Sequence, residues 1–74
     1  MKLFTISINA ITKNKQKVEE NHVLEFVEIL ESGKKLPPIK LRKSGDAYIL
    51  VDGRHRLAAH KALGLDSIDA TLTL

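Results

Sequence analysis

The sequence predicts a small α+β domain in which a mixed β-sheet packs against two helices, in the order β-α-β-β-α-β. Residues 67–74 alternate polar and apolar side chains strictly, as a half-buried strand does. Residues 18–32 repeat apolar side chains at helical spacing. Residues 48–64 join an apolar run, a turn and an alanine-rich helix. Two helices over one sheet would bury all of these apolar faces.

The N-terminal segment is expected to form a strand followed by a loop. Residues 3–8 are predicted to form the strand, because Phe4, Ile6 and Ile8 alternate with polar side chains. Residues 12–17 are polar and basic and show no apolar period, which indicates a loop.

The first helix is expected over residues 18–32. Most of its glutamates would lie opposite an apolar stripe, and Gly33 follows as the left-handed residue that ends many helices. His22 is expected to be a surface or capping residue rather than a ligand. The stripe consists of Val23, Leu24, Phe26, Val27 and Leu30.

A β-hairpin is expected after the first helix. Pro37 and Pro38 exclude a helix and favour an extended entry into a strand over residues 39–42. A turn at residues 44–46 would return the chain. Residues 48–51 are apolar without a break, which predicts a strand buried on both faces.

The second helix is predicted to follow directly on this strand. Asp52 and Gly53 have the chemistry of a turn, and Asp52 is also a good N-cap for the helix. The helix is expected to end at Leu63, because Gly64 suits the left-handed position that follows a helix.

Length and composition predict one domain over residues 1–74. The chain has no cysteine, so neither a disulfide framework nor thiol chemistry is available. Its apolar runs are far shorter than the roughly 20 residues of a membrane span, and no signal peptide is recognisable. We therefore expect a soluble cytoplasmic protein that does not bind membranes.

The net charge of +3 is too small to indicate nucleic-acid binding, but the basic residues are unevenly distributed. A basic run without acids follows the first helix, and such runs are usually solvated faces. The alternative is a basic surface that faces phosphates and binds DNA non-specifically. An exposed sheet edge would also allow a homodimer. The basic run consists of Lys34, Lys35, Lys40, Arg42 and Lys43.

The start of the second helix carries charges of the wrong sign. Arg54, His55 and Arg56 crowd a helix end that is itself partially positive, a mismatch of roughly 0.3–1 kcal/mol per cation. An anion would resolve this mismatch, because helix N–H groups and arginines together form a phosphate site. Alternatively, these side chains bend back to Asp52 or extend into water.

The segments Leu36–Ile39, Tyr48–Gly53 and Arg54–Ala59 resemble the ParB/sulfiredoxin superfamily, and within it the ParB-like N-terminal (ParB-like nuclease) domain. The resemblance extends from about Ile6 to Leu72. It implies the ParB/sulfiredoxin-like fold and a nucleotide, CTP or ATP, held by its phosphates at the turn and helix start, with Mg²⁺ as a companion ion.

The resemblance assigns the phosphate site to Gly53, Arg54, His55 and Arg56. Gly53 would allow close approach of the backbone, and Arg56 would be the charge-assisted clamp. His55 would donate a further hydrogen bond. In sulfiredoxin the corresponding turn reads Gly-Cys-His-Arg, so Arg54 replaces the reactive cysteine and sulfiredoxin chemistry is excluded.

This chain also departs from the ParB pattern. The ParB turn reads Gly-Glu-Arg-Arg, and its acid is missing here, although Asp52 lies one position earlier. The arginine-bearing box of ParB corresponds to a loop with only Lys13, Lys15 and Lys17. No helix-turn-helix module of the kind that reads a DNA groove is expected within residues 1–74.

An enzyme of the same superfamily is the alternative function, because some members are nucleases or small-molecule kinases. Phosphoryl transfer needs a base or a metal ligand near the phosphates. Asp52 is the acid at this position, with His55 as a weaker candidate. A zinc site is not expected, because the three histidines lack ligand spacing. They are His22, His55 and His60.

Overall fold

The computed structural model describes residues 3–11 and 17–73 and confirms the predicted order of elements. It adds one short 3₁₀-helix after the first strand. The elements are β1 (Leu3–Ser7), η1 (Ile8–Ala10), α1 (Glu20–Glu31), β2 (Ile39–Ser44), β3 (Ala47–Asp52), α2 (Arg54–Ala62) and β4 (Ser67–Leu72).

The four strands form one mixed sheet in the order β1-β4-β2-β3. β1 pairs with β4 and β2 pairs with β3 in antiparallel fashion, whereas β2 and β4 are parallel. The sheet is curled, as shown by contacts between its two outermost strands, β1 and β3. Phe4 of β1 and Tyr48 of β3 have ring centroids 6.3 Å apart, and Ile11 forms an isolated bridge with Tyr48.

The core lies inside this curl and centres on the parallel pair of strands. Ile39 and Leu41 of β2 are fully buried, and Ala70 of β4 is paired with Ile39. Truncating a fully buried isoleucine or leucine to alanine typically lowers the stability of a protein by about 2–5 kcal/mol. The core also includes Ile6, Ile8, Ile11, Leu50, Leu57 and Ile68.

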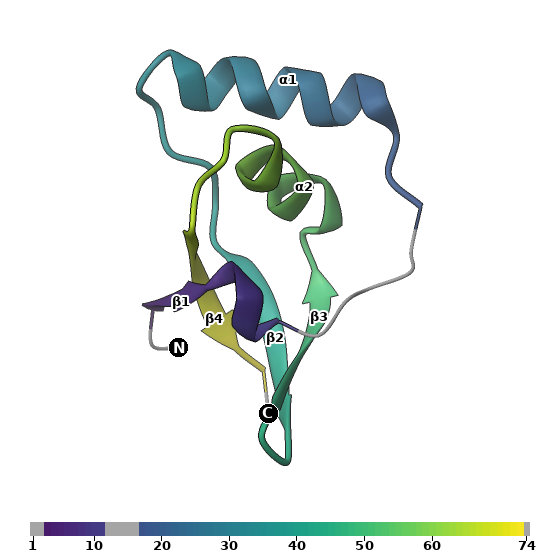
Figure 1. Cartoon of the computed structure of the whole chain (residues 1–74), viewed down its shortest axis with the longest axis vertical. Coiled ribbons are helices and arrows are strands. Elements are labelled where there is room, and N and C mark those ends of the chain that lie inside the picture. The colour runs from purple at the N-terminus through teal and green to yellow at the C-terminus, as the bar shows by residue number, and fades with distance from the viewer. Residues whose placement is uncertain (1–2, 12–16, 74) are drawn as a thin grey trace.

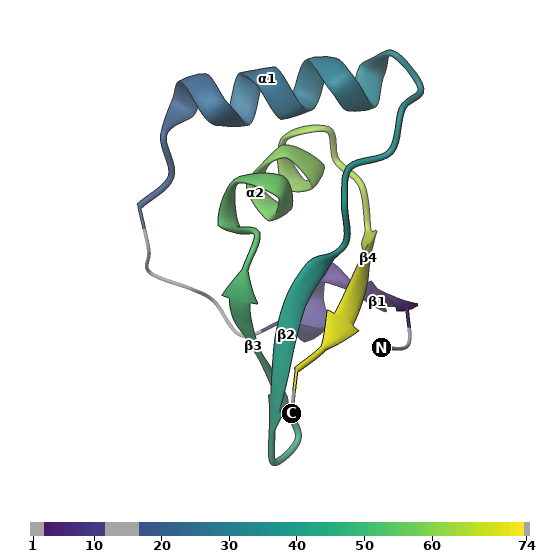
Figure 2. The same ribbon diagram turned by 180° about the vertical axis from the view of Figure 1, so that it is seen from behind.

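The helices form two further layers at one end of the sheet. α2 lies against the end of the curled sheet, and α1 crosses over α2 (Figures 1 and 2). Within the part of the chain described, no residue of α1 is fully buried, and Leu24 is 53% exposed. The predicted stripe of α1 is therefore half-buried, and the assignment of Leu24 to it was wrong, because the stripe covers a narrow helix rather than a sheet.

The prediction that residues 48–51 form a strand buried on both faces was wrong. Leu50 is the buried residue of β3, whereas Val51 is 52% exposed. β3 lies at the edge of the sheet and pairs with β2, but Val51 falls at a shift in register between Lys40 and Leu41 and has no partner in β2.

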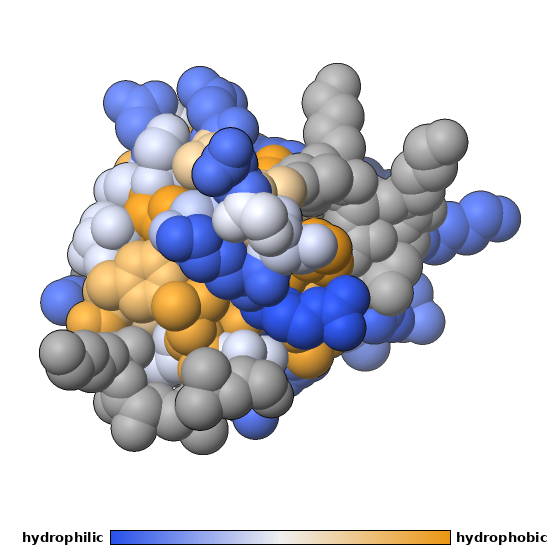
Figure 3. Space-filling model, turned by 90° about the horizontal axis from the view of Figure 1, so that it is seen from below, coloured by the Kyte–Doolittle hydropathy of each residue, from blue (hydrophilic) through white to orange (hydrophobic). Residues whose placement is uncertain are grey.

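The end of the molecule opposite the helices carries mixed side chains, with apolar surface on either side of a hydrophilic band (Figure 3). Lys40 and Arg42 of β2 are exposed and alternate with the buried Ile39 and Leu41. These cations therefore project away from the face on which α2 packs. No helix of the described residues is long and apolar enough to cross a membrane.

Candidate functional site

The junction of β3 and α2 turns at a single residue. Asp52 is still part of β3 and pairs with Lys40, Gly53 has φ of +107°, and α2 begins at Arg54. The helix N-cap is therefore Gly53, and no side chain caps the helix. The prediction that Asp52 is the N-cap was wrong, because Asp52 remains in the strand and its carboxylate is engaged elsewhere.

Gly53 is held where no side chain fits. A Cβ atom added to it would lie 2.6 Å from Cγ2 of Ile39 and 3.2 Å from Nη2 of Arg56. Residues other than glycine also rarely adopt its positive φ. The backbone of the turn thus passes directly over Ile39, one of the two fully buried residues of β2.

Arg56 ties three segments together. Its Nη2 donates to Oδ2 of Asp52 at 3.1 Å, and its Nη1 donates to the carbonyls of Pro37 and Pro38 at 3.2 and 2.8 Å. The side chain is only 16% exposed, against 63% for that of Asp52. In this structure Arg56 therefore bends back, as the alternative interpretation of the basic helix start expected.

Arg54 and His55 hold the segment that leads into α1. Nε of Arg54 donates to the carbonyl of Lys17 at 3.0 Å, and Nε2 of His55 accepts the backbone N–H of Glu19 at 3.0 Å. Because Nε2 accepts, this contact requires the neutral ring with its proton on Nδ1. The His22 ring meets the His55 ring edge-on at 5.1 Å.

Sequence reasoning missed these contacts with the segment before α1. Nothing in the sequence pairs Arg54 or His55 with positions more than thirty residues away, since no local pattern spans that separation. His22 is an exposed residue, 3.5 Å from the carboxylate of Glu19, in agreement with its expected surface position. The predicted loop cations Lys13 and Lys15 lie outside the described residues.

A pocket of about 140 Å³ opens at the start of α2, and we call it the α2 pocket. The first backbone N–H of α2 that donates a hydrogen bond to a carbonyl of the preceding turn is that of Leu57. It donates to the carbonyl of Gly53 at 2.9 Å. The preceding N–H groups, of residues 54–56, have no carbonyl partner within the helix, and these three residues line the pocket. The lining consists of Phe26 of α1 and the consecutive residues Asp52, Gly53, Arg54, His55 and Arg56.

The α2 pocket brings together every residue predicted for the site. Backbone donors and two guanidinium groups favour an anion the size of a phosphate group. Asp52 also lines the pocket, but Arg56 already holds its carboxylate. Among the described residues there is no cluster of three or more side chains that could hold a metal ion.

Comparison with known sequences relates the chain to one family. Residues 1–73 match the ParB N-terminal domain. An uncharacterized protein of Methanocaldococcus jannaschii is 32% identical over 66 residues, which cover 88% of this chain. The chain spans only 25% of that relative.

Solved structures share the fold. Sulfiredoxin from Arabidopsis thaliana superposes with a TM-score of 0.87 at 21% identity, covering 99% of this chain and 85% of that one. The ParB protein of Caulobacter crescentus, complexed with CTP-gamma-S, gives 0.81 at 19% identity, covering 99% and 44%. A free serine kinase in complex with AMP gives 0.80 at 27% identity, covering 96% and 30%. By its sequence match and by its fold, the chain belongs to the ParB N-terminal domain family.

Proposed function

We propose that this domain binds a nucleotide by its phosphates in the α2 pocket. The observation that carries the proposal is the geometry of that pocket, in which the first three residues of α2, two of them arginines, line a space of about 140 Å³. That space suits a phosphate group, so the base and sugar would lie outside it. The complexes of the serine kinase with AMP and of ParB with CTP-gamma-S support a nucleotide as the ligand.

Each residue of the turn has a role in this proposal. Gly53 lets the phosphate approach the backbone, and the N–H groups of residues 54–56 donate to its oxygens. Arg54 contributes a guanidinium at the exposed rim, and Arg56 a second one from the wall. Mg²⁺ would bind chiefly to the phosphate oxygens of a triphosphate, as this ion commonly does.

Titration with nucleotides tests the proposal. We expect ATP or CTP to bind saturably, with and without Mg²⁺, and Arg54→Gln to weaken binding about tenfold, because one charge-assisted contact is lost. Lys61→Gln is the matched control, since it removes the same charge from an exposed site on the last turn of α2. Isothermal titration calorimetry on the three proteins measures the effect.

Two results would overturn this proposal. Either no nucleotide or inorganic phosphate binds to the folded wild type, or Arg54→Gln and Lys61→Gln weaken binding equally. The second result would mean that the ligand responds to the overall charge of the domain and not to the α2 pocket.

Asp52→Asn is expected to tighten the binding of AMP measured without Mg²⁺, by about three- to tenfold. The carboxylate of Asp52 lines the α2 pocket and competes with a phosphate for Arg56 at 3.1 Å. Removing its charge weakens the competition and eliminates the repulsion, effects that together are worth about 1 kcal/mol at a partly hydrated site. Calorimetry at two ionic strengths checks this, because an electrostatic gain must shrink as salt rises. Weaker binding of AMP would contradict the prediction.

The same variant also tests whether the domain is catalytic. This question arises because one of the similar solved structures is a free serine kinase. If Asp52 were a general base, Asp52→Asn would abolish turnover of ATP or CTP while leaving binding intact. The carboxylate of Asp52 is already engaged by Arg56 at 3.1 Å, which favours binding over proton abstraction as the function of this domain. Product formation by wild type and variant decides between the two.

A further inference from the structure

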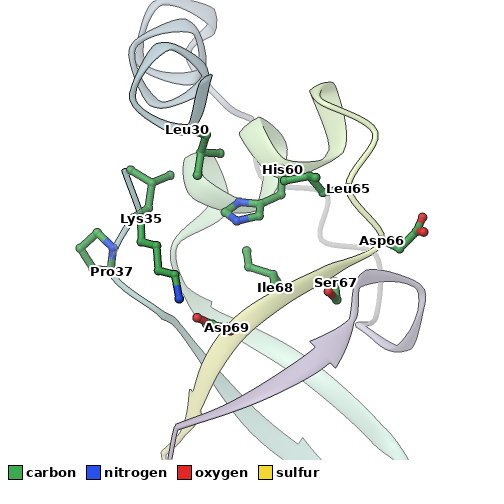
Figure 4. A pocket seen from close by; sticks show the side chains of 10 residues that line it. Leu30, Lys35, Pro37, His60, Leu65, Asp66, Ser67, Ile68 and Asp69 are labelled. Carbon is green, nitrogen blue, oxygen red and sulfur yellow. The ribbon is translucent and has the colours of Figure 1, made fainter. Parts of the chain in front are cut away.

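A second pocket, of about 310 Å³, lies away from the start of α2, and we call it the β4 pocket (Figure 4). The end of α1, the linker before β2, the last turn of α2 and the first half of β4 enclose it. Its volume is at the lower end of the range of about 300–1,000 Å³ that is usual for small-molecule sites. Its lining includes Leu30, Lys35, His60, Leu65, Ile68 and Asp69.

The β4 pocket is separate from the α2 pocket. The nine residues of α2 separate its two ends by about 13 Å, and the two linings share no residue. A ligand in the β4 pocket would therefore be a second ligand, independent of the nucleotide proposed above.

One wall of the β4 pocket is aliphatic. Leu30 comes from α1, Leu65 from the loop after α2 and Ile68 from β4, and Figure 4 shows all three around the hollow. Ile68 is 4% exposed and belongs to the core, whereas Leu65 is 45% exposed and open to a ligand. This wall favours a short aliphatic group.

His60 offers a hydrogen-bond acceptor beside this wall. Its Nδ1 lies 2.8 Å from the carbonyl oxygen of Arg56, and because a carbonyl only accepts, Nδ1 carries the proton. In the neutral ring Nε2 is then a bare acceptor. Figure 4 shows the ring in the pocket between Leu30 and Ile68. A ligand must therefore supply an N–H or O–H donor here.

Opposite charges face each other at the mouth. Figure 4 shows the ammonium of Lys35 and the carboxylate of Asp69 pointing toward one another. Among the described residues, Lys35 and Asp69 are not one of the ion pairs with an N–O distance of 4.0 Å or less. Asp69 is fixed in place, because its Oδ1 accepts a hydrogen bond from the hydroxyl of Thr5 at 2.9 Å. Even an exposed ion pair contributes only about 0–1 kcal/mol, so a ligand that comes between these two charges loses little.

We propose that the β4 pocket binds a free aliphatic α-amino acid. The ammonium group of the ligand donates to Asp69 and to Nε2 of His60, and its carboxylate pairs with Lys35. Its side chain lies on the aliphatic wall formed by Leu30, Leu65 and Ile68. An amino acid meets all three requirements at once, because its two charges are separated by a single carbon that also bears the side chain.

Leucine and its two single-charge analogues test the proposal. We expect leucine to shift the amide resonances of residues 35–36 and 66–69 in ¹H–¹⁵N NMR spectra, with residues 53–56 unchanged. 3-Methylbutylamine lacks the carboxylate and 4-methylpentanoate lacks the ammonium. Each should bind at least about tenfold more weakly, because each loses one charge-assisted contact.

Matched variants identify the partners within the pocket. Asp69→Asn, which keeps the acceptor for Thr5, and Lys35→Gln should each weaken leucine binding about tenfold. Lys34→Gln is the control, since Lys34 is exposed and lies next to Lys35 without lining the pocket. Circular dichroism of each variant confirms folding.

The proposal is overturned if leucine shifts no resonance of the β4 pocket, if either analogue binds as well as leucine, or if Asp69→Asn and Lys35→Gln bind like Lys34→Gln. Titrating AMP into the same samples follows the resonances of residues 53–56. Failure of the α2 pocket and failure of the β4 pocket are therefore observed separately.

Discussion

Gly53→Ala is expected to lower the free energy of unfolding by about 2–5 kcal/mol. Two costs add, because the residue sits at φ of +107° and its new Cβ would meet Cγ2 of Ile39 at 2.6 Å. Left-handed backbone costs a residue other than glycine about 1–2 kcal/mol, and overpacking costs about 1–3 kcal/mol. Ile39 cannot move away cheaply, since it is fully buried in the centre of the sheet. Urea unfolding followed by circular dichroism measures the loss.

Gly64→Ala separates the two costs. Gly64 has φ of +72°, but a Cβ there would meet nothing within 4 Å, so only backbone strain applies. We expect a loss of about 1–2 kcal/mol for Gly64→Ala and a clearly larger one for Gly53→Ala. Equal losses would show that the turn yields to a side chain and that close packing on Ile39 is not what requires glycine.

The order of elements could be predicted because each element carries its own local signal. The proline pair, the alternation in β4 and the glycines after the two helices act over a few residues. Gly33 and Gly64 do adopt positive φ directly after α1 and α2. The fold class follows from these local signals together with the need to bury each apolar face.

Position within the sheet could not be predicted in the same way. The apolar run of β3 was interpreted as buried on both faces, yet β3 is an edge strand and Val51 is exposed. Which strand lies at an edge depends on pairing between segments that are distant in sequence. The composition of a single strand does not indicate this pairing. The same limit explains Leu24, because a stripe predicts which face of a helix packs but not how wide its neighbour is.

The site was predicted as a set of residues but not as a network. The basic start of α2 predicted residues 54–56 as part of the site, and they do line one pocket. Apart from the Asp52 carboxylate, their partners are backbone groups of Lys17, Glu19, Pro37 and Pro38. Backbone atoms are present at every position, so the sequence cannot indicate which of them an arginine will reach.

Arg56→Ala is expected to lower the free energy of unfolding by about 2 kcal/mol and to abolish phosphate binding in the α2 pocket. Its hydrogen bonds to Pro37 and Pro38 join the entry of β2 to α2, and the shorter of them, at 2.8 Å, is partly buried. A buried carbonyl left without its donor costs about 1–3 kcal/mol. Urea unfolding and calorimetry with AMP measure the two effects.

Asp52→Ala shows which contacts of Arg56 matter for folding. The ion pair with Asp52 is largely exposed on the acid's side and should contribute under about 1 kcal/mol. Arg56→Ala should therefore cost nearly as much in the Asp52→Ala background as in the wild type. If the cost vanished there, the ion pair would be the anchor instead of the proline carbonyls. Because the proline carbonyls carry no net charge, they fix Arg56 in place without neutralising it, and either Asp52 or a phosphate can then balance its charge.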